Sequence, residues 1–266
     1  MKNTAFITGA TSGFGEAMAR ILSKDGYKLI LLGRRKDRLE TLAKELGNTH
    51  IIACDIRDKK AVFDSVESLP NEFKDIEILI NNAGLALGLE RVNEASLDDF
   101  ETMIDTNIKG LLYTTKAVLP IMTKRKSGYI FNLGSVAGQW PYPGGNVYGA
   151  TKAFVKQFSF NLRNDLKGDN IRVTEIAPGI AKTEFSLVRY KGDEQKSDAV
   201  YDGTSYLEAD DIAKIVLDCI NLPKHVNINS LEVMPTTQSW AGFFFEKEKA
   251  NSNVYRYLFM CLFIIQ

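Results

Sequence analysis

Short apolar runs alternate with longer amphipathic stretches along most of the chain. The runs are rich in Ile, Leu and Val, which is typical of strands that are buried on both faces of a sheet. We expect seven strands, at residues 5–8, 28–32, 50–54, 76–80, 128–133, 171–176 and 229–234. The stretches between them have the length of helices. The alternation predicts an α/β fold, a doubly wound parallel sheet of the Rossmann type in a single domain.

The first predicted strand leads directly into a glycine-rich turn, Gly9-Ala10-Thr11-Ser12-Gly13-Phe14-Gly15. A strand, a glycine turn and a helix together form a cradle for a dinucleotide, whose pyrophosphate lies at the helix N-terminus. Gly9 would permit the tight turn, Gly13 the approach of the backbone to the phosphates, and Gly15 the close packing of helix on strand. A glycine string alone is a weak signal. Its position at the first strand-to-helix turn favours a dinucleotide site.

Tyr148 and Lys152 are four residues apart in a predicted helix, so they lie on one face of it. A free tyrosine, with a pKa of about 10, is about 4 kcal/mol too weak an acid to exchange its proton readily at neutral pH. A positive charge about 4 Å away supplies about 4 kcal/mol at an effective dielectric constant of about 20. We therefore expect Lys152 to lower the pKa of Tyr148. For an isolated pair of this kind, a surface tyrosine and a solvated lysine are the usual alternative.

The second predicted strand is followed by two arginines, Arg34 and Arg35, and by no carboxylate. Enzymes that use NAD usually place an acidic residue here to bind the ribose hydroxyls. Guanidinium groups instead suit the 2′-phosphate of NADP. We therefore expect NADP as the cofactor, with ordinary loop arginines as the alternative.

Further motifs follow in a fixed order. They are Asn81-Asn82-Ala83-Gly84, Asn107, Asn132-Leu133-Gly134-Ser135 and Pro178-Gly179-Ile180-Ala181-Lys182-Thr183. With the glycine turn and the Tyr148-x-x-x-Lys152 pair, they resemble the short-chain dehydrogenase/reductase family. The likeness runs from about Lys2 to Gly242. A closer likeness lies in residues 33–35, 82–88, 103–107, 144–154 and 225–229. These segments resemble the branch of NADP-dependent 3-hydroxy-acid dehydrogenases, of the serine dehydrogenase and malonic semialdehyde reductase type.

The resemblance implies a role for each motif. Ser135 and Tyr148 would donate hydrogen bonds to the substrate oxygen, and Tyr148 would transfer the proton. Lys152 would also bind the nicotinamide ribose, and Asn107 would anchor a water that leads to solvent. Outside this context, Ser135 would be a turn serine and Asn107 a capping or kink residue. The residues expected to bind the cofactor are Gly9, Thr11, Ser12, Gly13, Phe14, Gly15, Arg34, Arg35, Asp55, Ile56, Asn82, Tyr148, Lys152, Pro178, Gly179, Ile180 and Thr183.

The expected activity is hydride transfer between NADP(H) and a small 3-hydroxy acid or its semialdehyde, such as serine, allo-threonine or 3-hydroxypropionate. A carboxylate in a partly sealed site needs a cation. Arg189, in the expected lid at 184–193, is the candidate; alternatively it is a surface arginine paired with Glu184 or Asp193. A broader NADPH-dependent ketone or 3-ketoacyl reductase, and a non-catalytic dinucleotide-binding regulator, are the other functions considered. The stretch after Gly179 is a residue shorter than in the resembling branch, which puts contacts at 180–182 in doubt.

Composition limits the classes of binding partner that we expect for this protein. Lys+Arg and Asp+Glu balance at 33 each, so nothing favours nucleic acid. Three cysteines without ligand spacing predict no metal site, and the missing signal peptide predicts a cytoplasmic protein.

The resemblance and the amphipathic stretches 97–109 and 111–126 predict a homo-oligomer, a tetramer. We assign residues 1–242 to the dehydrogenase domain and 243–266 to a divergent tail. Its apolar run 258–265 is far shorter than the about 20 residues that span a membrane. A subunit contact, weak membrane association and an extension without a role stay open.

Overall fold

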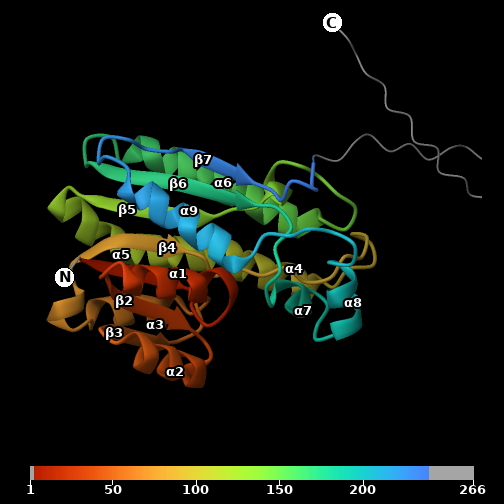
Figure 1. Cartoon of the computed structure of the whole chain (residues 1–266), viewed down its shortest axis with the longest axis horizontal. Helices are drawn as coiled ribbons and strands as arrows, with labels where there is room; N and C mark the ends of the chain where they lie inside the picture. Colours follow the sequence, from red (N-terminus) through yellow and green to blue (C-terminus); the bar gives the residue numbers. More distant parts are fainter. Residues whose placement is uncertain (1–2, 240–266) are drawn as a thin grey trace, which may run out of the picture.

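The computed structural model describes residues 3–239, which form one seven-stranded parallel sheet (Figure 1). The strands lie in the order β3-β2-β1-β4-β5-β6-β7. Their bounds are β1 (Thr4–Thr8), β2 (Lys28–Gly33), β3 (Thr49–Ala53), β4 (Ile76–Asn81), β5 (Gly128–Leu133), β6 (Ile171–Pro178) and β7 (Ser230–Val233). The seven predicted strands and the parallel fold are confirmed, with strand ends within about two residues of prediction. The order reverses between β1 and β4, and sheets of this kind bind ligands at such a switch point.

Helices cover both faces of the sheet. The longer ones are α1 (Gly13–Lys24), α2 (Lys36–Leu46), α3 (Lys59–Glu67), α5 (Leu111–Arg125), α6 (Asn146–Asp165) and α9 (Ala209–Asn221). One core packs α1, α2 and α9 on the face that carries Ile7, and the other packs α3, α5 and α6 on the face that carries Phe6. Both side chains are fully buried. Burial on two faces explains why the strands read as continuous apolar runs.

Three consecutive helical elements lie between β4 and β5 in the chain. They are α4 (Leu97–Ile104), a π-helical stretch η2 (Asp105–Gly110) and α5. Ser96 stands at the N-cap of α4, but its side chain makes no capping hydrogen bond. Asn107 lies in the π-helical stretch and is buried. Such stretches are frequent at functional sites.

Short helices stand at the end of the sheet where its strands terminate. After β6 the chain forms α7 (Phe185–Arg189) and α8 (Glu194–Ala199), which lie on the right in Figure 1. The expected lid at 184–193 contains α7. Two 3-10 turns, η1 (Asn71–Phe73) and η3 (Val136–Gly138), complete the elements. The predicted tail 243–266 lies outside the described residues. Between residues 3 and 239, no helix is long and apolar enough to cross a membrane.

Candidate active site

A cleft of about 630 Å³ lies at the carboxyl ends of the strands. Nearly all of the residues predicted to bind cofactor or substrate line it. These are Gly9, Thr11, Ser12, Gly13, Phe14, Arg34, Arg35, Asp55, Ile56, Asn82, Ser135, Tyr148, Lys152, Pro178, Gly179, Ile180, Thr183 and Arg189. Gly15 and Asn107, which were also predicted, are not part of this lining and act from behind it.

The glycine turn after β1 is packed too tightly for larger residues. Gly9 has a φ of 65°, and a Cβ there would lie 2.9 Å from the Cα of Ala83. A Cβ on Gly15 would lie 2.3 Å from the carbonyl oxygen of Gly9, which fits the predicted close packing of helix on strand. The Asn82 side chain donates hydrogen bonds to the carbonyls of Thr8 (2.9 Å) and Gly9 (3.1 Å). Asn82 therefore fixes the turn from the neighbouring strand.

Ser135, Tyr148 and Lys152 meet beside this turn. Tyr148 and Lys152 are a turn apart on α6 and are both buried, and Ser135 follows β5. Ser135 Oγ accepts the backbone N–H of Ala137 at 3.1 Å. The Lys152 ammonium lies 5.8 Å from the centroid of the Tyr148 ring and donates to the Leu133 carbonyl at 2.7 Å. The three residues predicted to act on the substrate are thus brought together.

Burial dominates the electrostatics of this group. It raises the pKa of Tyr148 to about 12, although the hydrogen bond with Ser135 and the charge of Arg189 act in the opposite direction. Burial also lowers the pKa of Lys152 to about 8, against the attraction of Glu175. The net shift of the Tyr148 pKa is therefore upward and not the expected lowering, because burial outweighs the charges and hydrogen bonds that favour the phenolate. The Lys152 ammonium itself donates to the Leu133 carbonyl. Tyr148 keeps its proton at neutral pH and is poised as a donor.

Asn107 supports the site from behind. Its side-chain oxygen accepts the N–H of Leu85 at 2.8 Å, and its nitrogen donates to the Leu85 carbonyl at 2.8 Å and to Thr151 Oγ1 at 3.0 Å. A Cβ on Gly84 would lie 3.3 Å from the Asn107 oxygen and 3.4 Å from Lys152 Nζ. The amide therefore holds the 83–85 loop against the lysine. The predicted water contact of Asn107 stays a prediction.

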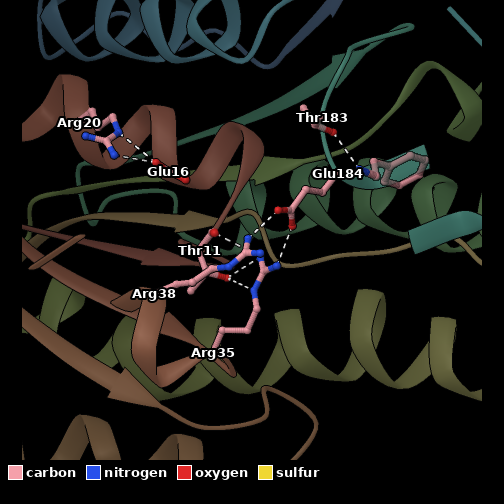
Figure 2. Close-up of polar contacts among 8 residues, drawn as sticks. Thr11, Glu16, Arg20, Arg35, Arg38, Thr183 and Glu184 are labelled. Atoms are coloured by element: carbon pink, nitrogen blue, oxygen red, sulfur yellow. Dashed lines mark hydrogen bonds and ion pairs between the residues drawn. The ribbon is translucent and has the colours of Figure 1, made fainter. Parts of the chain in front are cut away.

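Arg35 faces the cleft from the N-terminus of α2 (Figure 2). Its guanidinium donates to Thr11 Oγ1 at 2.9 and 3.1 Å and to the Thr11 carbonyl at 3.2 Å. Its remaining nitrogen pairs with Glu184 at 2.7 Å. Arg38 pairs with the other oxygen of Glu184 at 2.5 Å and was missed in the sequence, although it stands three residues after Arg35 in the first turn of α2. Arg34 lines the same part of the cleft.

Arg189 reaches Tyr148 from α7. Its carbon Cζ lies 5.6 Å from the centroid of the Tyr148 ring. Its Nε donates to the Gly88 carbonyl at 3.1 Å, and one terminal nitrogen donates to the Tyr142 hydroxyl at 2.7 Å. The alternative pairing with Glu184 or Asp193 is wrong, since Glu184 pairs with Arg35 and Arg38, and Asp193 pairs with Lys196 at 3.1 Å. Within residues 3–239, no carboxylate forms an ion pair with Arg189.

Two contacts at the cleft rim were not expected. The N–H of Ile180 donates to Gln238 Oε1 at 2.7 Å, so the shortened stretch after Gly179 is held by a side chain from the C-terminal segment. Asp55, predicted to bind the cofactor, pairs with Arg57 at 2.7 Å. No sequence signal distinguished Gln238.

Over the described range, no group of three or more His, Cys, Asp or Glu residues could hold a metal ion.

A row of buried and half-buried polar side chains crosses the sheet below the cleft. The register places Asn81, Asn132, Glu175 and Ser230 side by side on four strands. The Asn81 amide donates to Asn132 Oδ1 at 2.9 Å, and Ser230 donates to Glu175 Oε2 at 2.5 Å. Glu175 Oε1 is buried without a hydrogen-bond partner in the described part of the chain, and burial raises the pKa of this carboxyl. The row lies one layer beneath Ser135, since a Cβ on Gly134 would meet Glu175.

Comparisons with known proteins agree with this geometry. Residues 3–193 match the short chain dehydrogenase family. The NADP-dependent 3-hydroxy acid dehydrogenase YdfG of Salmonella typhi is 55% identical over 238 residues, 89% of this chain and 96% of that protein. Sulfoacetaldehyde reductase 2 of Chromohalobacter salexigens is 52% identical over 252 residues, 93% of this chain and 100% of that protein.

A solved structure is similar over nearly the same length. The closed form of serine dehydrogenase complexed with NADP+ superimposes with a TM-score of 0.91 at 53% identity, covering 92% of this chain and 100% of that one. Fold, motif order and sequence identity therefore agree. The chain belongs to the short-chain dehydrogenase/reductase family.

Proposed function

We propose that the protein is an oxidoreductase that transfers a hydride between NADP(H) and a small 3-hydroxy acid or its semialdehyde. The observation that carries the proposal is the position of Arg189. Its guanidinium lies 5.6 Å from the Tyr148 ring and pairs with no carboxylate of residues 3–239. A substrate only a few atoms long can therefore place its anionic group at Arg189 and its reacting oxygen at Tyr148.

The residues present fit NADP. The turn at Gly9 leaves no room for a Cβ and precedes the N-terminus of α1, where a pyrophosphate is favoured. Arg34 and Arg35 line the cleft at the end of β2, the position that decides between a ribose hydroxyl and a 2′-phosphate. NADPH, when bound, would supply the hydride for reduction. The relatives named for NADP support the same cofactor.

The chain's own residues would manage the proton. In reduction, the hydroxyls of Ser135 and Tyr148 donate hydrogen bonds to the carbonyl oxygen of the substrate. As a hydride adds to the carbon, Tyr148 transfers its proton to the oxygen, which yields the alcohol and leaves a phenolate. A hydrogen bond from Ser135 would stabilise that phenolate, and the ammonium of Lys152 lies 5.8 Å from the centroid of its ring. In oxidation the phenolate removes the alcohol proton.

A sulfonate is a second candidate for the anionic group of the substrate. The guanidinium of Arg189 suits a carboxylate or a sulfonate, and one similar protein is named for sulfoacetaldehyde. Rates should be compared on serine, 3-hydroxypropionate, 3-hydroxyisobutyrate, sulfoacetaldehyde and a 3-ketoacyl thioester. We expect the small anionic substrates to be used best. A marked preference for the thioester would instead support the broader ketoacyl reductase, and no turnover on any of them would support a non-catalytic regulator.

Cofactor preference provides a separate prediction. Replacing Arg34 and Arg35 together by neutral residues should raise the KM for NADPH far more than the KM for NADH. The loss is that of charge-assisted hydrogen bonds to one phosphate, about 2 to 4 kcal/mol in total. Steady-state kinetics with both cofactors measures it. Equal use of NADPH and NADH by the unmodified protein would contradict the proposal.

We also propose a homo-oligomer, in which α4 contributes to the contact. Leu97 and Ile104, seven residues apart on α4, are 68% and 37% exposed, and a partner subunit would cover them. Light scattering at micromolar concentration should give a multiple of the 29.7 kDa chain mass. A mass near that of one chain would refute the proposal. A cytoplasmic location stays a prediction, supported by the free thiols of Cys54 and Cys219, the cysteines that lie within residues 3–239.

A further inference from the structure

Glu184 connects two parts of the cleft that are far apart in the sequence. It directly precedes α7, and its side chain extends to two arginines of the α2 region (Figure 2). One oxygen lies 2.7 Å from Arg35 Nη1 and the other lies 2.5 Å from Arg38 Nη1. The carboxylate thus bridges two guanidinium groups. No other acidic side chain of residues 3–239 forms an ion pair with either arginine.

The guanidinium groups that Glu184 contacts are placed where the 2′-phosphate of NADP is expected. Arg35 is held from behind, because its Nε and Nη2 donate to Thr11 in the glycine turn. Its remaining terminal nitrogen, Nη1, is the one that Glu184 engages. A phosphate would bind the same outward donors, since guanidinium groups recognise carboxylate and phosphate oxygens with the same geometry.

The charge of Glu184 is maintained at neutral pH. Burial raises the pKa of its carboxyl, but the hydrogen bonds and charges of Arg38 and Arg35 outweigh this and hold the pKa below its ordinary value. A phosphate approaching Arg35 and Arg38 therefore meets two cations that are already partly neutralised. It also meets a negative charge at close range, which repels it.

We infer that Glu184 is a cofactor-specificity residue, whose carboxylate competes with the 2′-phosphate of NADP(H) for Arg35 and Arg38. The inference rests on the proposed NADP cofactor. Binding of the phosphate exchanges one anion for another, so the affinity for NADP(H) is lower than the two arginines alone would give. Because Glu184 adjoins α7, the exchange also breaks the contact that ties this helix, with Arg189, to α2.

Nucleotide fragments test the inference without chemistry or substrate. Adenosine 2′,5′-bisphosphate carries the 2′-phosphate and 5′-AMP lacks it, and the binding of each is measured by calorimetry. For Glu184→Gln, which keeps the shape of the side chain, we expect the bisphosphate to bind about threefold to tenfold more tightly than to the unmodified protein, in the range of two released, partly exposed ion pairs. The affinity for 5′-AMP should stay the same. In about 1 M salt the gain should largely disappear.

Glu45→Gln is the matched control. Glu45 lies in the last turn of α2 and pairs with Arg20, so the variant removes an equal charge from the same region without touching Arg35 or Arg38. It should not change either affinity. An unchanged or weaker affinity of Glu184→Gln for the bisphosphate would overturn the inference, as would an equal gain in the control. If the unmodified protein bound both fragments equally well, the proposed NADP preference itself would fail.

Discussion

Replacing Tyr148 by phenylalanine is expected to lower kcat by about a hundredfold or more, because the variant lacks the hydroxyl that we propose as the general acid. The affinity for NADPH should be nearly unchanged. The ring stays in place between its neighbours, including Phe185, whose ring centroid lies 5.6 Å away. Steady-state rates of carbonyl reduction and a fluorescence titration with NADPH measure the two quantities.

A second variant, Lys152→Met, distinguishes loss of the proton donor from loss of cofactor binding. Lys152→Met removes both a charge and a group expected to bind the nicotinamide ribose, so it should weaken NADPH binding and turnover together. If Tyr148→Phe retained more than a few per cent of activity, the assignment of the proton donor would be wrong. With its pKa raised to about 12, Tyr148 should remain protonated across the neutral range. Deprotonation of Tyr148 should therefore not limit reduction between about pH 6 and 9.

Arg189→Met is expected to lower kcat/KM by about a hundredfold or more for serine or malonic semialdehyde, while activity on an uncharged aldehyde changes little. The loss of one partner from a largely dehydrated ion pair costs about 3 to 5 kcal/mol, against about 1 or less for an exposed pair. The side chain is part-buried and lies over the Tyr148 ring, which favours the larger value. Initial rates on both classes of substrate give the comparison.

Tyr142→Phe is the control for this experiment. It keeps the charge of Arg189 and removes only the hydroxyl that accepts its hydrogen bond. Its effect on the acidic substrates should be about tenfold or less, the usual range for one neutral hydrogen bond. Equal losses on charged and uncharged substrates in Arg189→Met would mean that Arg189 supports α7 only. No loss on either would place the substrate anion elsewhere.

The sequence was sufficient for the features that repeat along the chain or lie within one local segment. Strands buried on two faces appear as apolar runs, so the sheet was predicted to within about two residues at each strand end. The glycine turn, and Tyr148 with Lys152, depend only on neighbours a turn apart. These local patterns predicted most of the residues that line the cleft.

Features that depend on distant contacts were not predicted. Arg38 and Glu184 are 146 residues apart in the chain, and Gln238 is 58 residues from the backbone N–H that it binds. The expected lowering of the Tyr148 pKa was not found for a related reason. The Coulomb argument for Tyr148 used a fixed lysine distance, whereas burial and the Leu133 carbonyl, both set by the tertiary fold, decide the outcome.

The polar row beneath the cleft has a consequence for folding. In a sheet covered on both faces, a strand that slips by one residue still places apolar side chains on both sides, so hydrophobicity alone specifies its register weakly. Such a slip would separate the Asn81–Asn132 amide pair and the Ser230–Glu175 bond and leave their groups in an apolar layer. The row therefore selects one alignment of β4, β5, β6 and β7. That alignment brings Ser135, at the end of β5, level with the cleft.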